Sequence, residues 1–343
     1  MEKMKAAFLI NYGSADSAFQ LREVQKPSPG KGEVRVSVEA FGLNFAEVAA
    51  RHGMYREAPP LPFVPGYDFV GHVEAMGPGG NANLVGTRVA GMARFGTYAT
   101  HVVTLEQGVV EIPEDMDAGE ATAIGVQYST AYYAAVVCMN LFPGDRVLIH
   151  AAAGGVGTAL VQLCKWKGCT VYATVGSEEK AARARETGAD FVINYREQDY
   201  EVEMKRLLNG AKLDAAFNAV AGKTFKMDMR LLGSGGKLVL FGAADRMGKR
   251  GGKLGTYKLL YDMGLVLPIL LMAKSKTIIG VNMLKLSDHR PDVLQHCLTE
   301  LIKLYRSGVV KPIIHGVYGI DDLARAHDDL EFRRTMGKTA IKW

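Results

Sequence analysis

The sequence predicts an α/β protein made of a β-rich domain and a doubly wound parallel sheet, and three observations lead to this fold class. Short strand-like runs separated by proline and glycine fill the first 126 residues. Strand-like and helix-like segments alternate from Gln127 onward. A glycine-rich stretch, residues 150–157, stands between a short apolar run and a helical one, as at the first crossover of such a sheet.

Length and composition set the class of protein. The chain has 343 residues, enough for two domains of ~150 residues each. Its 48% apolar and 22% charged residues are ordinary for a globular protein. The net charge of +5 comes without a basic block, so we expect no nucleic-acid partner. With no C-x-x-C pair, no signal peptide and no apolar run of ~20 residues, we expect a cytoplasmic protein.

The first 126 residues are expected to form a barrel-like antiparallel domain. The run Glu33–Ala40 alternates polar and apolar residues, as a half-exposed strand does. It follows a loop rich in proline and glycine at 26–32. The other predicted strands here are Lys5–Ile10, Val70–Met76, Arg88–Met92 and Tyr98–Val103.

The next part is expected to be a parallel sheet covered by helices, because alternating strands and helices form right-handed crossovers. The predicted strands are Val147–Ile149, Thr170–Val175, Phe191–Asn194, Leu213–Asn218, Lys237–Phe241 and Thr277–Val281. The predicted helices are Tyr128–Met139, Ala159–Trp166, Glu178–Thr187, Tyr200–Leu208 and Phe225–Leu232. Beyond them we expect one long helix at Ser287–Ser307 and a closing strand at Thr339–Lys342 that returns to the first domain.

The glycine-rich stretch predicts a site for the diphosphate of a dinucleotide. A tight turn of small residues lets the backbone approach a diphosphate, and the following helix N-terminus offers free N–H groups and partial positive charge. The pattern is A-x-G-x-x-G, with Ala152 in place of the first glycine of the fingerprint. The residues expected to bind the cofactor here are Ala152, Gly154, Gly155, Val156 and Gly157.

The end of the next predicted strand indicates which nicotinamide cofactor is preferred. NAD-specific folds carry an acidic residue ~20 positions past the loop, where it binds the ribose hydroxyls. Here the strand ends in Gly176 and Ser177, and Lys180 lies one helical turn further on. A glycine leaves room for a 2′-phosphate that a hydroxyl and an ammonium can bind, so we expect NADPH. The competing interpretation is that Glu178 or Glu179 turns inward and selects NADH.

Several stretches resemble a known family. Similarity to zinc-free medium-chain reductases of the quinone oxidoreductase (zeta-crystallin) type lies in GLNFAE (42–47), GMY (53–55), PPLP (59–62), PG (65–66), HAAAGGVG (150–157) and VINYRE (192–197). Within that group the VAT-1 subfamily is the most similar, through residues 44–65, 161–164 and 309–341. The resemblance covers almost the whole chain. It implies a GroES-like catalytic domain at 1–126, completed by 284–343, and a Rossmann domain at 127–283, with the active site between them and a homodimer formed by Rossmann edge strands.

The resemblance also implies roles for single cofactor-binding residues. Tyr195 is expected to add its hydroxyl to the 2′-phosphate site. Thr130 is expected to bond the carboxamide or the neighbouring ribose; the alternative is a hydroxyl that bonds its own backbone near a helix N-terminus. Phe241 and Gly242 end a parallel strand where the nicotinamide passes in this fold.

The same resemblance concerns the catalytic residues and the metal. Asn44 and Tyr55 are the candidates to line the pocket and bond the substrate oxygen, with a structural hydrogen bond as the alternative for each. Zinc-dependent relatives have cysteine at the position of Asn44 and Gly-His-Glu at that of Gly66-Tyr67-Asp68. A catalytic zinc needs about three N, S or O ligands, and asparagine and tyrosine are poor ones. We therefore expect chemistry without zinc.

Together these expectations describe an NADPH-dependent oxidoreductase that reduces a quinone or an α,β-unsaturated carbonyl by hydride transfer. Water can protonate the reduced oxygens of a quinone, whereas an enone benefits from a donor, for which Tyr55 is the candidate. The alternative is an NADPH-binding, VAT-1-like protein that acts at a membrane or lipid surface with little turnover.

The two possible functions predict different surroundings for the apolar segment 259–273. It is interrupted by Asp262 and Pro268, so it is too short to span a bilayer. One interpretation is that it packs over the domain cleft or a dimer partner. The other is that it rests on an anionic membrane beside Lys249, Arg250, Lys253 and Lys258. The following strand, Thr277–Val281, is an apolar sheet edge of the kind that pairs with a second copy.

Overall fold

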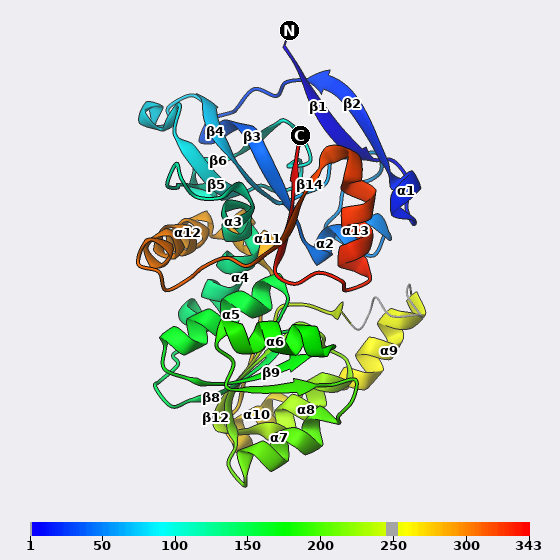
Figure 1. The fold of residues 1–343 in the computed structure, drawn as a ribbon, viewed down its shortest axis with the longest axis vertical. Coiled ribbons are helices and arrows are strands. Elements are labelled where there is room, and N and C mark those ends of the chain that lie inside the picture. The colour runs from blue at the N-terminus through cyan, green and yellow to red at the C-terminus, as the bar shows by residue number, and fades with distance from the viewer. Residues whose placement is uncertain (1, 245–252) are drawn as a thin grey trace. The chain divides into compact units, whose positions relative to one another are not determined.

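The computed structural model describes residues 2–244 and 253–343 (Figure 1). The chain forms two compact units, Met1–Ser129 with Met283–Trp343 and Thr130–Asn282. The first is built on an antiparallel sheet and the second on a parallel one, which confirms the predicted fold class. Lys249 and Arg250, named above as neighbours of the apolar segment, lie outside the described residues.

The first unit contains a seven-stranded sheet in the order β14-β15-β3-β4-β5-β7, with β6 also paired to β3. All its pairs are antiparallel except β14 with β15, and a separate hairpin is formed by β1 and β2. The closing strand pairs with β3 and so returns to the first domain, as expected from the sequence. The strands are β1 (Lys3–Leu9), β2 (Phe19–Gln25), β3 (Glu33–Leu43), β4 (Asp68–Met76), β5 (Arg88–Met92), β6 (His101–Leu105), β7 (Val109–Glu111), β14 (Ile314–Gly319) and β15 (Lys338–Lys342).

The strand register of this sheet brings distant residues together. Gly42 on β3 faces Ala340 on β15, and Phe41 faces Phe69 on β4. The end of β3, the start of β4 and the start of β15 therefore meet. Phe41 also stacks on Tyr98, with ring centroids 4.5 Å apart, in the buried core beneath.

One predicted helix of the first unit is wrong. The segment Ser287–Ser307 is not continuous, because the backbone leaves the helical region at Arg290 (φ −138°, ψ 61°) before Pro291. A residue before proline is disfavoured in the helical region, so the proline starts a new helix. The helices of this unit are α1 (Ala15–Ala18), α2 (Phe45–Arg51), α3 (Ala118–Ala123), α11 (Met283–His289), α12 (Pro291–Arg306) and α13 (Leu323–Glu331).

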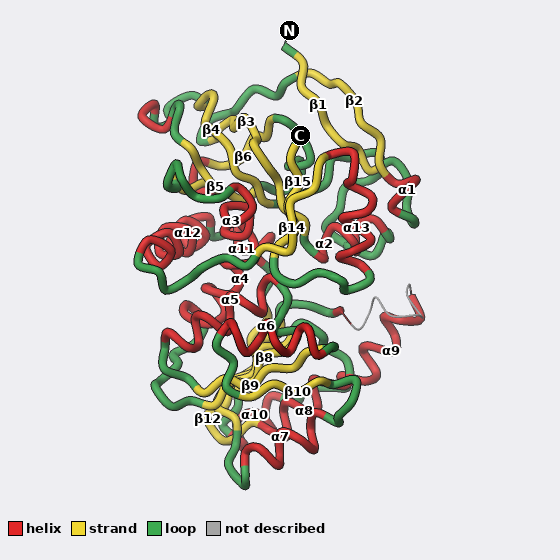
Figure 2. The backbone as a smooth tube through the Cα atoms, in the orientation of Figure 1, coloured by secondary structure: helices red, strands yellow, loops and turns green. Residues whose placement is uncertain are grey.

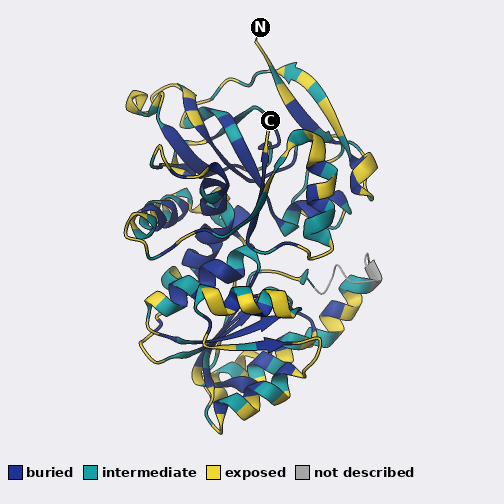
Figure 3. Ribbon diagram, viewed as in Figure 1, coloured by how far each residue is buried: buried dark blue, intermediate teal, exposed yellow. Residues whose placement is uncertain are grey.

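The second unit is a six-stranded, fully parallel sheet in the order β10-β9-β8-β11-β12-β13. Numbered from its first strand this is 3-2-1-4-5-6, the doubly wound order that reverses between β8 and β11. Its central strands are buried (Figure 3). The strands are β8 (Arg146–His150), β9 (Thr170–Val175), β10 (Phe191–Asn194), β11 (Leu213–Asn218), β12 (Leu232–Leu240) and β13 (Thr277–Gly280).

Helices cover both faces of this sheet (Figures 1 and 2). Right-handed crossovers place α5 and α6 on one face and α7 and α8 on the other. Helices α9 and α10 form the connection to β13. The helices are α5 (Gly155–Trp166), α6 (Glu178–Thr187), α7 (Tyr200–Leu208), α8 (Lys223–Leu231), α9 (Lys253–Met263) and α10 (Pro268–Lys274).

The helical segment around Thr130 starts earlier than predicted. Helical backbone begins at Ala118 and continues through π-helical turns at Ile124–Tyr128 and Tyr133–Val137, on either side of α4 (Ser129–Tyr132). Thr130 therefore follows helical backbone and does not lie at the start of the segment, and both roles given for its hydroxyl stay predictions. Its side chain is buried.

Candidate functional site

The glycine-rich turn has the geometry that a diphosphate site requires. It follows β8, and α5 begins at Gly155 with Gly154 as its N-cap. A Cβ built on Gly157 would lie 2.2 Å from the carbonyl oxygen of Ala151, so a glycine is needed for the helix to pack against the turn. The left-handed conformation falls on Ala151 (φ 52°) and not on Ala152. The alanine that replaces the first glycine is therefore compatible with the turn.

The residues predicted to select the cofactor gather at the end of β9. A Cβ built on Gly176 would lie 2.6 Å from the hydroxyl of Tyr195, so that hydroxyl rests on the bare glycine backbone. The Ser177 hydroxyl caps α6 by accepting from the N–H of Lys180 at 3.3 Å. The carboxylate of Glu178 is hydrogen-bonded by Arg185 further along the helix, at 2.8 Å, and so is directed away from the strand tip.

Two turns meet beyond the strands on the other side of the sheet reversal. The N–H of Phe241 donates to the carbonyl of Asn218 at 3.2 Å. A Cβ on Gly242 would lie 2.7 Å from the carbonyl oxygen of Ala219. The end of β12 thus contacts the turn after β11, at the carboxyl ends of the strands where ligands bind in this fold.

Asn44 lies in a buried polar cluster of the first unit. Its Nδ2 donates to Asp68 at 2.9 Å, and its Oδ1 accepts from Lys338 Nζ at 3.0 Å. Lys338 also donates to Asp68 at 2.6 Å, and both side chains are fully buried. The backbone N–H of Asn44 donates to Glu47 at 2.8 Å. Both Nδ2 and Oδ1 of Asn44 are therefore hydrogen-bonded within the protein, as the alternative of a structural hydrogen bond requires. A hydrogen bond from Asn44 to the substrate stays a prediction.

The charges of this cluster are balanced. Burial, with the nearby Asp68 carboxylate as the second cause, raises the pKa of Glu47 to about 8. At neutral pH the cluster is then one ammonium, one carboxylate and one neutral acid. Gly42 makes room for it, because a Cβ there would lie 2.1 Å from Lys338 and 2.2 Å from Asp68.

Tyr55 lies next to this cluster through Tyr67. The two rings meet edge to face, with centroids 6.1 Å apart, and Tyr67 also packs against Phe95. Burial raises the pKa of Tyr55, which keeps its hydroxyl protonated and able to donate. Tyr55 is half-buried, unlike Tyr67, so its hydroxyl remains the candidate donor.

The positions that hold the metal in zinc-dependent relatives carry this network. Asn44 and Asp68 bond each other and the Lys338 ammonium, and Tyr67 takes part in an aromatic group. Across residues 2–244 and 253–343, no group of three or more His, Cys, Asp or Glu side chains has the arrangement of a metal site.

The sequence did not reveal Lys338, Glu47, His150 or Asp228 as functional candidates. Lys338 is the first residue of β15 (KTAIK), and only the pairing of that strand with β3 places it beside Asp68. Asp228 sits on α8, where a charged residue is normally solvated, yet it is fully buried. The signal that was available is the histidine that directly follows the apolar run Val147–Ile149 of β8.

Comparison with known proteins agrees with this geometry. The model of the zinc-binding dehydrogenase family matches residues 155–299, and that of the alcohol dehydrogenase GroES-like domain matches residues 30–114. These matches, the sheet order and the glycine turn define a medium-chain dehydrogenase/reductase, a class of oxidoreductase.

Individual relatives show which family of this class the chain belongs to. The rat synaptic vesicle membrane protein VAT-1 homolog is 31% identical over 98% of this chain and 84% of the relative. Human quinone oxidoreductase is 29% identical over 95% of this chain and 94% of the relative. The crystal structure of Escherichia coli quinone oxidoreductase complexed with NADPH superposes with a TM-score of 0.86 at 28% identity, covering 99% of this chain and 100% of that one. The chain belongs to the quinone oxidoreductase-type family of medium-chain reductases and is VAT-1-like.

Proposed function

We propose that this protein is a zinc-independent oxidoreductase that uses NADPH to reduce a quinone or an α,β-unsaturated carbonyl. The observation that carries the proposal is the glycine turn at the reversal of a 3-2-1-4-5-6 sheet, with Gly176, Ser177, Lys180 and Tyr195 beyond the neighbouring strand. A bacterial relative of the same fold is an NADPH complex of a quinone oxidoreductase. None of the four cysteines, all of them among the described residues, forms a disulfide, which supports a cytoplasmic location as part of the proposal.

In this proposal the chain binds and orients, and NADPH supplies the hydride. The turn from Ala152 to Gly157 would hold the diphosphate. Thr130, Phe241 and Gly242 would orient the nicotinamide. Tyr55 would donate a proton, or a hydrogen bond, to the substrate oxygen, and Asn44 would line the substrate pocket, as the family resemblance implies.

Cofactor choice is tested with Lys180→Ala. We expect the variant to bind NADPH about tenfold more weakly, because a charge-assisted hydrogen bond to the 2′-phosphate contributes ~1–2 kcal/mol. Its affinity for NADH should not change. The measurement is titration calorimetry with both cofactors.

The matched control is Arg183→Ala, which removes another cation of α6 that pairs with Glu186 instead. This variant should bind both cofactors like the wild type. Equal dissociation constants of the wild type for NADPH and NADH would contradict the proposed cofactor choice.

Metal content is a separate prediction. Because an ammonium neutralises Asp68 and bonds Asn44, we expect elemental analysis of the purified protein to find no stoichiometric zinc. A chelator should change neither turnover nor melting temperature. A content near one zinc per chain would overturn this part of the proposal.

The connection formed by α9 and α10 bears the surface we propose for assembly. Among the described helices none is long and apolar enough to cross a membrane alone, although these two together meet that measure with a bend of 42°. Their apolar side chains are mostly exposed, with Tyr261 at 83%, Leu265 at 95% and Met272 at 76%, whereas Leu259 is buried. Packing on the chain's own core therefore does not account for them.

We propose that a second copy of the chain covers this surface. Helix α10 leads directly into β13, which ends the sheet and, within the described part of the chain, pairs only with β12. An unpaired edge beside an apolar surface is suited to a two-fold dimer. A membrane is the less favoured occupant, because Lys258 forms an ion pair with Asp262 of its own helix.

Sedimentation at micromolar concentration distinguishes the two occupants. We expect the wild type to be a dimer and Leu267→Asp with Leu270→Asp to be a folded monomer, since both leucines are about half exposed. The melting temperature of this variant should not rise with protein concentration, as that of a dimer does. Leu21→Asp, at a position of similar exposure on β2, should stay dimeric. A wild-type monomer that floats with phosphatidylserine vesicles at low salt would replace the dimer with the membrane-surface alternative.

A further inference from the structure

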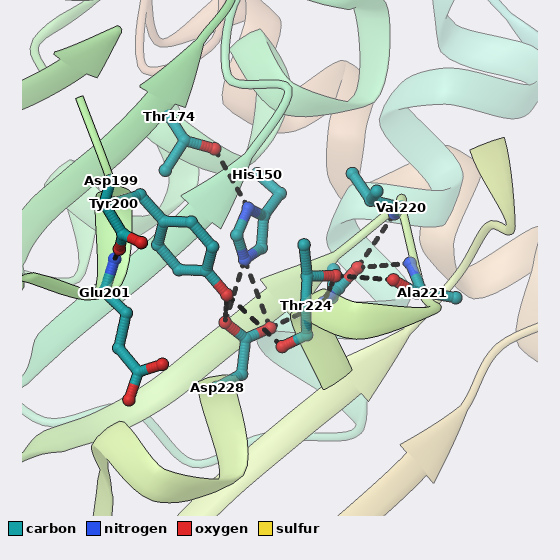
Figure 4. Close-up of polar contacts among 10 residues, drawn as sticks. His150, Thr174, Asp199, Tyr200, Glu201, Val220, Ala221, Thr224 and Asp228 are labelled. Atoms are coloured by element: carbon teal, nitrogen blue, oxygen red, sulfur yellow. Dashed lines mark hydrogen bonds and ion pairs between the residues drawn. The ribbon is translucent and has the colours of Figure 1, made fainter. Parts of the chain in front are cut away.

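A buried hydrogen-bond network ties together the elements around the reversal of the parallel sheet (Figure 4). His150, the last residue of β8, contacts Thr174 Oγ1 of β9 through Nδ1 at 2.9 Å. Its Nε2 contacts the Asp228 carboxylate of α8 at 2.9 and 3.1 Å. Asn218, the last residue of β11, donates to the same carboxylate at 2.5 Å, and Tyr200 of α7 donates to it at 3.1 Å.

The network satisfies a charge that has no access to water. Asp228 is fully buried, and a buried carboxylate is tolerated only when donors surround it. His150, Tyr200 and Asn218 supply these donors. Burial, with the Asp228 charge as the second cause, raises the pKa of Tyr200, so its hydroxyl stays a donor. The arrangement is therefore rigid and specific in geometry.

Each of the two strands that end in the network is followed by a constrained turn. Ala151, directly after His150, has φ 52°, and Ala221, after Asn218, has φ 61°. A residue with a Cβ is disfavoured there and needs support from its surroundings. Asn218 gives that support, since its Oδ1 accepts from the N–H groups of Val220 and Ala221, each at 2.8 Å.

Thr224 completes the second turn. Its hydroxyl donates to the carbonyl of Ala221 at 2.7 Å and accepts from Asn218 Nδ2 at 2.9 Å. The turn 219–222 is thus held from its strand by Asn218 and from α8 by Thr224, while Asp228 fixes the amide of Asn218 (Figure 4).

The two turns held by this network lie at the edge of the sheet where this fold binds a dinucleotide. In a sheet of order 3-2-1-4-5-6 a dinucleotide lies across the reversal, at the carboxyl ends of the strands. The turn after β8 is on the side of the adenosine and diphosphate, and the turn after β11 is on the nicotinamide side, in contact with Gly242.

We propose that His150, Asp228 and Asn218 act as a clamp that positions the turn 219–222 against the nicotinamide half of the cofactor and fixes its distance from the diphosphate turn. These are positioning residues, because they act through backbone turns. The inference rests on the proposed NADPH site. It adds that the affinity for the nicotinamide half depends on side chains buried behind the site.

The test compares two ligands on the same variants of the full chain. NADPH spans both turns, whereas adenosine 2′,5′-bisphosphate carries only the adenine half. In Asn218→Ala two backbone N–H groups lose their acceptor, so we expect NADPH to bind about tenfold more weakly by calorimetry, and the bisphosphate to change by less than about twofold. Thr224→Val, a milder change in the same turn, should show the same selectivity with a smaller loss.

Leu231→Ala is the control for general destabilisation. It empties a buried site at the end of the same helix and removes none of the hydrogen bonds of the network. This variant should melt lower yet keep the wild-type ratio of the two dissociation constants. If Asn218→Ala and Thr224→Val both bind the two ligands like the wild type, or lose affinity for both equally, the clamp is overturned. A wild type that binds neither ligand would instead refute the proposed cofactor site.

Discussion

Replacing Gly157 with alanine is expected to weaken NADPH binding and lower the melting temperature together. The new Cβ would lie 2.2 Å from the carbonyl oxygen of Ala151 and 2.7 Å from the Cα of Ala152. Both are backbone atoms, so the turn itself must move. Overpacking of this kind costs about 1–3 kcal/mol, and a displaced turn no longer fits the diphosphate, so we expect the dissociation constant to rise about tenfold or more.

Gly154→Ala is expected to affect the binding of NADPH more than the packing of α5 on the turn. The nearest atom to its new Cβ is the Ala151 carbonyl oxygen at 3.2 Å, and the φ of −80° suits any residue. The melting temperature should fall less than in Gly157→Ala, because at 3.2 Å the neighbour needs to move by only a few tenths of an ångström, while the added methyl group would stand in the proposed path of the diphosphate and weaken NADPH binding. If Gly157→Ala melted and bound NADPH like the wild type, the close packing of α5 on the turn would not be what the site requires.

Glu47→Gln is expected to change how the stability of the protein depends on pH. The folded pKa of Glu47 is raised to about 8, whereas an unfolded glutamate titrates near 4.3. Between these values the folded state holds a proton that the unfolded state lacks. The contribution of Glu47 is therefore present at low pH and is lost as pH rises, with a slope of up to ~1.4 kcal/mol per pH unit.

Glutamine cannot titrate, so the variant should become more stable relative to the wild type as pH increases from 5 to 8. Denaturant unfolding at several pH values measures this difference. A difference that stays constant with pH would mean that Glu47 is not held neutral in the cluster. Glu33→Gln, on the surface side of β3, is a control that should follow the wild type.

The periodicity of the sequence predicted the parallel sheet well because each strand and helix there is a local pattern. The strands Thr170–Val175 and Phe191–Asn194 and the helix Glu178–Thr187 begin and end as predicted. The helix expected at Ser287–Ser307 is interrupted at Arg290, because a residue before proline is disfavoured in the helical conformation. Strands β2 and β14 were missed, because their pairing partners and not their own sequences define them.

The candidate site shows the same difference between local patterns, which the sequence predicts, and contacts between distant residues, which it does not. The glycine turn and the run from Gly176 to Lys180 are each local in sequence, so motif and spacing indicated them, whereas Tyr195 was named only through the family resemblance. The pairs Asp68–Lys338 and His150–Asp228 join residues far apart in the chain and depend on strand register and helix rotation. A sequence pattern predicts neither pair.

The central claim is tested most directly by steady-state oxidation of NADPH with a panel of quinones and α,β-unsaturated carbonyls, beside NADH at the same concentration. We predict that at least one acceptor is reduced at a rate proportional to protein, that NADPH is consumed faster than NADH, and that Gly157→Ala lowers the activity at limiting NADPH about tenfold or more, in line with its weaker binding. Oxidation no faster than without protein for every acceptor, in a sample that binds NADPH, would contradict the claim.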